Sequence, residues 1–479
     1  MKKYIFTIAI FITILTNCTT DFENINTNQN SPVNVQPSLL LRQVIYDFGE
    51  QMSYEGFAAG NLLAQHYALL DFNLFDRHDL KSPQLGGNPW PIFFTNLRDN
   101  EIILKKSRNN AAFKVYEGPS LILKAYMAAA LTDIFGDVPY FEAFNGIEGS
   151  VTPVYDLQED IYQKEKGILD NIDKGIAAIN AYSGSISLEG DILFNGDLNG
   201  WIRFANSLKI KYLIRISAKI DVTNQLQTLF TNGNYITSNN QNATFDFTNS
   251  APNSFRFAQL RNGDFTNFVM SKTAQEIFEN LNDNRVDNFY QPFVNATSNE
   301  YSGLINGINA ATTTPSPNNY SLVGKIFRED TSSLDANFIT AWETNFLLAE
   351  AALKGLISAN AETLYNNGVT QAFEYWNTSL PVNYLTENAN INAIGKTPLE
   401  QIITQKWIAN TINGYEGWIE YNRTGFPELK TISASLNNDL IPVRMPYPAE
   451  EATLNADNYA KAAATTDNNS INSPVWWNE

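Results

Sequence analysis

Apolar residues at helical spacing recur at both ends of the 479-residue chain, and this periodicity constrains its fold more than any other sequence feature. Strand-like alternation is sparse by comparison, so the pattern predicts a mainly α protein whose helices each turn an apolar stripe toward a shared core. The first stripe follows Ser38, which is its predicted N-cap, and consists of Leu41, Val44, Ile45, Phe48 and Met52.

Two further helix starts carry capping signals. Thr397, Pro398 and Glu400 combine a cap residue, a proline at the first helical position and a glutamate that can reach back. Asp156 and Glu159 stand at capping-box spacing beside a second apolar series, which runs through Leu157, Ile161, Ile168, Leu169, Ile172, Ile176 and Ile179. We expect helices to begin at both places.

Residues 338–377 form the clearest helical pair in the sequence. Small alanines and large aromatic residues share two runs separated by Gly355, a composition that suits close antiparallel packing. A pair of this length resembles a tetratricopeptide unit, which has about 34 residues. Between about residues 220 and 335 the periodicity fades into Asn, Ser, Thr, Gly and Pro, so we expect a loop-rich functional surface there.

The N-terminal residues have the pattern of an export signal, which ends at the only cysteine of the chain. Two lysines precede an apolar run of about twelve residues, which is shorter than the roughly 20 that a membrane helix needs. Leu15, three positions before Cys18, resembles a bacterial lipobox, in which the cysteine is diacylated. We expect residues 1–17 to be a signal peptide, Cys18 to carry lipid and residues 18–37 to be a tether. The alternative is a secreted protein with an incidental cysteine.

The charge and the scarcity of reactive residues exclude several function classes. The chain has 32 basic against 50 acidic residues, a net charge of −18, which opposes binding to nucleic acid. One cysteine and two histidines leave no zinc cage or cysteine nucleophile, and no nucleotide-binding or serine-hydrolase motif is present, so we expect no cofactor. His66 is expected within a helix and His78 on a loop surface. A two-carboxylate glycoside hydrolase stays open.

Exposed aromatic rings commonly stack on the faces of sugars, although most aromatic rings of a globular protein lie in its core. Trp90 stands between two prolines in an expected loop that also carries Asp76 and Arg77, and it is the best exposed candidate. The alternative for Trp90 is a loop anchor. Tyr301 and Tyr320 flank the Gly-, Asn- and Thr-rich loop in the middle of the chain. These five residues are the predicted ligand contacts.

Several sequence blocks occur in a fixed order along the chain. The most distinctive runs from Leu131 to Tyr140, LTDIFGDVPY. It is followed by Asp191–Lys209, Asn282–Arg285 with Asn284 in place of proline, Glu343–Ala351, Gln405–Pro427, Pro446–Asn455 and the final Val475, Trp476 and Trp477. Together with the lipobox, this series resembles the SusD/RagB family of nutrient-binding outer-membrane lipoproteins.

The resemblance implies a single large domain over residues 38–479, with tetratricopeptide-like helical pairs as scaffold and a loop-rich ligand face. It also implies a partner, a SusC-like TonB-dependent transporter, to which the surface lipoprotein delivers a nutrient, most often an oligosaccharide. Anchoring would be to the outer membrane through lipid on Cys18, with the protein facing the cell exterior. No catalysis is implied, and peptide cargo is the alternative. Asp133, Gly136, Asp137 and Pro139 are expected to be structural.

Overall fold

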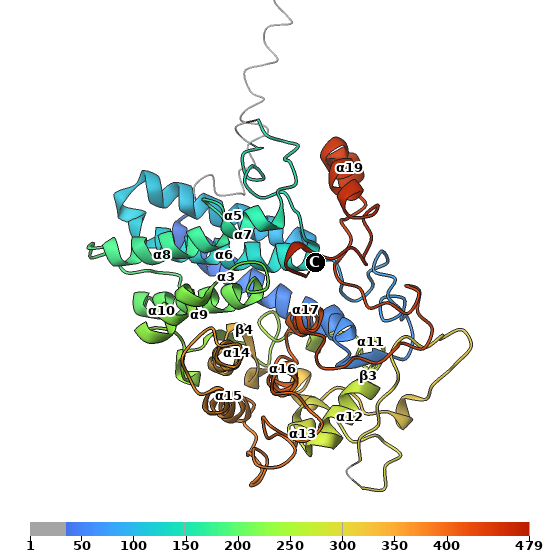
Figure 1. Cartoon of the computed structure of the whole chain (residues 1–479). Coiled ribbons are helices and arrows are strands. Elements are labelled where there is room, and N and C mark those ends of the chain that lie inside the picture. The colour runs from blue at the N-terminus through green and yellow to red at the C-terminus, as the bar shows by residue number, and fades with distance from the viewer. Residues whose placement is uncertain (1–34, 147–148, 299, 479) are drawn as a thin grey trace, which may run out of the picture.

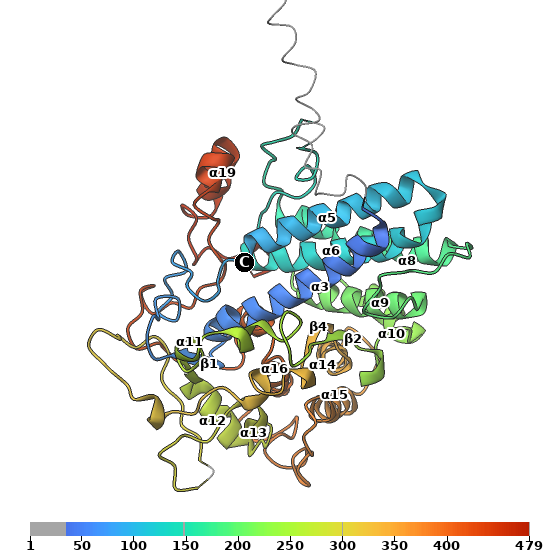
Figure 2. The ribbon, with the colours of Figure 1, turned by 180° about the vertical axis from the view of Figure 1, so that it is seen from behind.

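The structure is a computed structural model that describes residues 35–146, 149–298 and 300–478. The predicted signal peptide, Cys18 and most of the predicted tether lie outside the described residues. Figure 1 shows helices gathered on one side of the molecule and long loops on the other. In Figure 2 the first described helix crosses the back of the molecule and so links the two sides.

Helices from the first half of the chain pack side by side. Helix α6 packs against both α5 and α8, and α9 lies against α8 (Figure 1). The helices of this half are α3 (Pro37–Glu55), α4 (Asn61–Leu63), α5 (Trp90–Asn109), α6 (Glu117–Phe135), α7 (Gln158–Gln163), α8 (Ile168–Ala181), α9 (Leu198–Arg215) and α10 (Thr223–Asn232).

The second half adds one closely packed helical pair and several shorter helices. Helix α14 packs against both α15 and α9, which joins the two halves of the scaffold. The helices of this half are α11 (Asn262–Phe265), α12 (Lys272–Leu281), α13 (Val286–Phe289), α14 (Ala341–Leu353), α15 (Ala361–Tyr375), α16 (Pro398–Ala409), α17 (Gly414–Thr424), α18 (Glu451–Leu454) and α19 (Ala456–Thr465).

Strands are few among the described residues, and they form two antiparallel pairs. Strand β1 (Tyr67–Leu69) pairs with β3 (Phe268–Met270), and β2 (Ala243–Asp246) pairs with β4 (Asp335–Ile339). The predicted mainly α class with tetratricopeptide-like helical pairs is therefore confirmed. The described residues include no helix that combines the length and the apolar character needed to cross a bilayer.

Helix α3 confirms the first predicted stripe but starts earlier than predicted. Leu41, Val44, Ile45 and Phe48 are buried on one face. The N-cap is Gln36 rather than Ser38, because Pro37 has the φ angle of a first helical residue and suits that position. A π-turn over Gly56–Gly60 follows, where a Cβ atom on Gly60 would lie 2.1 Å from the backbone nitrogen of Tyr415. Only glycine allows α17 to approach this closely.

The second predicted helix is divided into α7 and α8. The chain leaves the helix at Lys164 and re-enters it after Gly167, whose backbone is extended. The predicted capping box is wrong, because the Asp156 carboxylate accepts the backbone N–H groups of Tyr140 and Phe141 at 3.0 and 2.9 Å. Asp156 therefore stabilises the turn after α6 and does not cap a helix.

The predictions for the late helices are confirmed. Thr397 caps α16 by accepting the backbone N–H of Glu400 at 3.1 Å, and Pro398 is the first helical residue. Helices α14 and α15 form the predicted pair. A Cβ atom on Gly368 would lie 2.7 Å from the Phe346 ring, so this glycine lets a large ring pack directly against the backbone of α15.

Candidate ligand-binding site

Charged side chains, most of them from the ordered sequence blocks, meet in a buried ion network that joins helices of both halves of the scaffold. Lys211 of α9 pairs with Glu343 of α14 at 2.9 Å and with Glu416 of α17 at 3.1 Å. Arg423 binds both carboxylate oxygens of Glu350, at 2.6 and 2.7 Å. The remaining members of the buried ion network are Asp133, Arg215, Lys406 and Glu420.

The electrostatics of the buried ion network show that its members stabilise one another. Burial raises the pKa of Glu416, but Arg215, Lys211 and Lys406 outweigh burial and lower that pKa to about 2. Removing one partner from such a cluster would leave an uncompensated buried charge. The network therefore belongs to the scaffold, since its buried charges compensate one another.

The block from Leu131 to Tyr140 is structural as well. The α6 helix ends at Gly136, whose φ of 78° is in the left-handed region that glycine adopts without strain. The Asp137 carboxylate accepts the backbone N–H of Gln158 at 2.8 Å, at the start of α7. Asp133 is buried and accepts the hydroxyl of Tyr162 at 2.6 Å.

Three loop segments far apart in the sequence are hydrogen-bonded into one layer, which we call the loop layer: residues 70–80, 301–309 and 432–441. The backbone N–H of Ala434 donates to the carbonyl of Gly307 at 2.8 Å, and that of Leu436 donates to the carbonyl of Arg77 at 2.7 Å. Arg77 Nε donates in turn to the carbonyl of Ala434 at 2.8 Å. The structure thus joins the segment that holds the predicted ligand contacts Asp76 and Arg77 to one segment from the middle of the chain and one from near its end.

Asp76 holds the loop layer together from inside. It is 1% exposed, and its carboxylate accepts the Asn306 amide at 2.6 Å and the backbone N–H groups of Gly307 and Leu69 at 2.9 and 3.2 Å. Burial raises the pKa of Asp76 to about 6, although these three hydrogen bonds oppose the rise. Asp76 therefore positions the loops, and its predicted direct contact with a ligand stays a prediction.

Phe72 is the exposed ring of the loop layer, and the sequence reasoning missed it. The residue is 68% exposed and its φ is 47°, a conformation that costs a bulky residue energy. Its backbone N–H donates to the neighbouring Asp71 carboxylate at 2.8 Å. Strained backbone and an exposed ring together make Phe72 a candidate functional position. The only sequence signal is an aromatic residue placed between an aspartate and an asparagine.

Tyr301 and Tyr320 lie in different surroundings. The Tyr301 hydroxyl donates to the Asp287 carboxylate at 2.5 Å, beside a cavity of about 740 Å³ that Phe293 also lines. Tyr320 is half-buried against a small apolar cluster that includes Leu70. Tyr301 lines this cavity and Tyr320 does not, and the role of each tyrosine as a ligand contact stays a prediction.

The expectation that Trp90 is exposed in a loop is wrong. Trp90 is the first residue of α5 and is only 8% exposed, because its ring packs against Phe94 at 4.8 Å and Phe135 at 4.9 Å between ring centroids. One edge still borders a hollow of about 360 Å³ that Tyr447 also lines. The anchoring alternative fits this packing, and ligand contact by Trp90 stays a prediction.

Both histidines are buried. His66 stacks on Trp407 with 3.8 Å between ring centroids, and burial lowers its pKa to about 3. His78 was expected on the surface but is 4% exposed, and its Nδ1 lies 3.1 Å from the carbonyl of Leu440. No group of three or more His, Cys, Asp and Glu side chains in the described ranges is placed to hold a metal ion.

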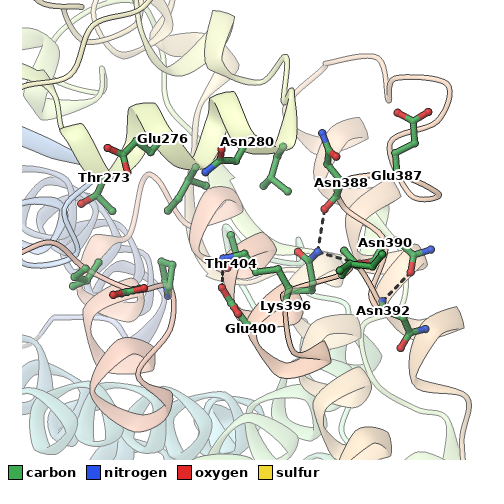
Figure 3. Close-up of a pocket in the computed structure, with 18 of the residues that line it drawn as sticks. Thr273, Glu276, Asn280, Glu387, Asn388, Asn390, Asn392, Lys396, Glu400 and Thr404 are labelled. Atoms are coloured by element: carbon green, nitrogen blue, oxygen red, sulfur yellow. Dashed lines mark hydrogen bonds and ion pairs between the residues drawn. The ribbon is translucent and has the colours of Figure 1, made fainter.

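A second surface feature is a cleft of about 850 Å³ between α12 and α16, which we call the amide cleft. Figure 3 shows α12 along one wall and the segment 387–392 facing it, with the first turns of α16 below. Asparagine side chains line both walls, and no aromatic residue is among the lining residues. Sequence reasoning missed this cleft because its walls come from segments more than a hundred residues apart.

Comparison with known proteins places the chain in a family. A family described as "Starch-binding associating with outer membrane" matches residues 28–448, which is most of the chain. The protein therefore belongs to the SusD-like family, as the ordered blocks predict. No curated protein sequence matches the chain significantly.

Solved structures of similar fold agree with this assignment. A chitin-binding protein is 25% identical, with a TM-score of 0.78 over 92% of this chain and 100% of its own. A SusD homologue from Bacteroides fragilis is 21% identical, with a TM-score of 0.79 over 93% of this chain and 100% of its own. A chitin-binding SusD homologue from Flavobacterium johnsoniae is 20% identical, with a TM-score of 0.75 over 92% and 98%.

Proposed function

We propose that this SusD-like protein binds a neutral glycan at the outer membrane and delivers it to a SusC-like TonB-dependent transporter. The observation that carries the binding role is the exposed ring of Phe72 on the loop layer, because sugar recognition combines ring stacking with hydrogen bonds from polar neighbours. The family description and the printed names of two structural neighbours support a polysaccharide ligand.

A neutral ligand fits the charge of the protein. Removing residues 1–17 would remove Lys2 and Lys3 and no acidic residue, which takes the net charge from −18 to −20. A field of this sign disfavours sulfated or uronate-rich chains. Chito-oligosaccharides are the first ligands to test, since the similar structures include chitin-binding proteins.

Affinity electrophoresis tests the cargo. The chain from Thr19 onward would be run through gels that contain glycol chitin, starch, alginate or casein, with serum albumin as the unretarded reference. Retardation by a neutral polysaccharide is the expected result. Retardation by casein alone would transfer the role to peptides, and steady release of reducing ends would make the protein a glycoside hydrolase.

The anchor and the partner are part of the same proposal and have separate tests. Cys18→Ser should abolish metabolic labelling with palmitate and release the protein from the outer membrane. Affinity purification of the full chain from native membranes should recover a TonB-dependent barrel. Recovery of the protein without any such barrel would contradict the delivery role, while leaving glycan binding to be judged by the gels.

A further inference from the structure

We propose that the amide cleft is a second binding site, which takes an extended peptide segment carrying basic side chains. The site lies apart from the loop layer, since none of the residues of segment 70–80 lines the cleft. The proposal is therefore independent of glycan binding at Phe72.

Three free amides line the cleft. Asn280 stands on α12, and Asn388 and Asn392 stand on the facing segment (Figure 3). Within the described part of the chain, none of the side-chain amides of these three residues has a hydrogen-bond partner. An asparagine side chain offers a carbonyl acceptor and an N–H donor, the same pair that a peptide group presents. Amides on both walls can therefore pair with the main chain of a segment lying between them.

The facing wall is held in place before any ligand arrives. Gln401 of α16 is 3% exposed, and its Nε2 donates to the backbone carbonyls of Asn388 and Asn390, both at 3.0 Å. The Asn390 side chain accepts the backbone N–H of Asn392 at 2.8 Å. A wall fixed in this way loses little conformational freedom on binding, which favours affinity.

The charged side chains that line the amide cleft favour a ligand with basic side chains. Both cations of the lining are already paired, Lys430 with Glu276 at 2.7 Å and Lys396 with Glu400. The lining carboxylates of Glu387 and Glu428 are exposed, and no ion pair to either occurs among the described residues. Two uncompensated negative charges at the rim attract lysine or arginine side chains.

The lining favours a peptide over a glycan. No ring lines the amide cleft, so a sugar face would find nothing to stack on. An extended peptide needs only main-chain hydrogen bonds for affinity and side-chain pockets or charges for selectivity. The volume of about 850 Å³ and the open rim accommodate such a segment.

Fluorescence anisotropy of the folded protein tests the proposal. The probe is a labelled peptide of about ten residues, roughly 33 Å long when extended, in which lysines alternate with serine and threonine. The counterpart probe has glutamate at each lysine position. We expect saturable binding of the lysine peptide with a dissociation constant in the micromolar range, about 10⁻⁶ to 10⁻⁴ M, and at least about tenfold weaker binding of the glutamate peptide.

Matched variants assign the binding to the cleft. Asn280→Ala combined with Asn392→Ala should weaken the lysine peptide about tenfold or more, while Asn224→Ala on the exposed face of α10 should not. Glu387→Gln combined with Glu428→Gln should weaken binding at low salt, whereas Glu374→Gln on α15 should have no effect. Circular dichroism should show each variant folded.

Three results would overturn the proposal. The first is that neither peptide shows saturable binding. The second is that the asparagine double variant binds the lysine peptide as tightly as the unmodified protein does, and the third is that this variant loses chito-oligosaccharide binding. The last result would make the cleft the glycan site. Glycan titrations of the same variants separate the two proposals, since we expect them to bind glycan as the unmodified chain does.

Discussion

The indole Nε1 of Trp477 donates a hydrogen bond of 2.9 Å to Oδ1 of Asp133, which ties the end of the chain to α6. The same oxygen accepts the Tyr162 hydroxyl, and Oδ2 lies 3.6 Å from Nε of Arg215. All four side chains are buried. Through Asp133, the C-terminal residues and α7 are therefore joined to the buried ion network.

Replacing Trp477 should destabilise the whole protein. Trp477→Phe keeps most of the ring but leaves Asp133 with one donor fewer, so we expect the free energy of unfolding to fall by about 1–3 kcal/mol. Urea unfolding followed by circular dichroism measures the change. Trp476→Phe is the matched control, because that half-buried indole packs against Tyr162 and no described residue accepts a hydrogen bond from its nitrogen. Equal losses in both variants would contradict a specific role for the Trp477 hydrogen bond.

The buried ion network should make stability fall at acid pH. The folded pKa of Glu416, about 2, lies below its ordinary value of 4.5, so its stabilising contribution is complete above pH 4.5. That contribution is lost as the pH falls toward 2. Glu416→Gln leaves Lys211 and Arg215 short of a counter-charge, and we expect it to cost about 3–5 kcal/mol at neutral pH.

Urea unfolding over a pH series checks this account of Glu416. The difference between the unmodified protein and Glu416→Gln should shrink as the pH approaches 2, since the carboxylate then carries a proton in both states. Glu374→Gln, an exposed substitution on α15, supplies the control for loss of one carboxylate. A constant difference at all pH values would contradict the low pKa of Glu416.

The strand pair β2–β4 should respond to pH in the opposite direction. Asp246 and Asp335 are direct partners in the register, and burial together with the Asp246 carboxylate raises the pKa of Asp335 to about 6. The folded state therefore binds the proton more tightly than the unfolded state, whose pKa is 3.8. This contribution to stability is complete below pH 3.8 and is lost as the pH rises through about 6.

Asp335→Asn tests this pair. The variant should be more stable than the unmodified protein at neutral pH, because it removes the repulsion between the two carboxylates. It should also lack the change in stability between pH 3.8 and about 6. Asp246→Asn should show a smaller gain, since it removes the repulsion but leaves the Asp335 carboxylate buried. Thermal unfolding across that pH range measures both, and a neutral-pH loss in both variants would contradict the account.

Variants of Trp90 test whether this residue is a loop anchor or a ligand contact. Because its ring packs against Phe94 and Phe135, Trp90→Ala should lower the free energy of unfolding by about 3–5 kcal/mol. Trp90→Phe should cost less and should keep glycan affinity. Denaturant unfolding and glycan titration of both variants decide the question. Unchanged stability with lost glycan affinity would show that Trp90 is a ligand contact rather than an anchor.

The local features of the fold could be predicted from sequence because they depend on neighbouring residues. The cap at Thr397 and the stripe of α3 need only helical spacing and one side-chain hydrogen bond. The break between α7 and α8 could not be predicted, because the apolar spacing continues across it. The role of Asp156 was also hidden, since its partners Tyr140 and Phe141 are about 15 residues away.

The candidate site was less accessible to sequence reasoning because it depends on long-range contacts. Proline neighbours suggested an exposed Trp90, but burial is decided by Phe135 and Tyr447 from distant segments. Phe72 combines an exposed ring with a left-handed backbone, and sequence spacing encodes neither. The ordered blocks predicted the family, and most members of the buried ion network lie within them.

Isothermal titration calorimetry of chitohexaose, with maltoheptaose as the second neutral glycan, would show whether the exposed ring of Phe72 binds a neutral glycan. We expect one of them to bind the chain from Thr19 onward, and we expect Phe72→Ala to weaken its binding about tenfold or more, because ring stacking contributes about 1–3 kcal/mol. Leu39→Ala, which removes a similarly exposed apolar side chain on α3, should leave affinity unchanged. Equal glycan affinity of Phe72→Ala and the unmodified chain would show that Phe72 does not bind the glycan.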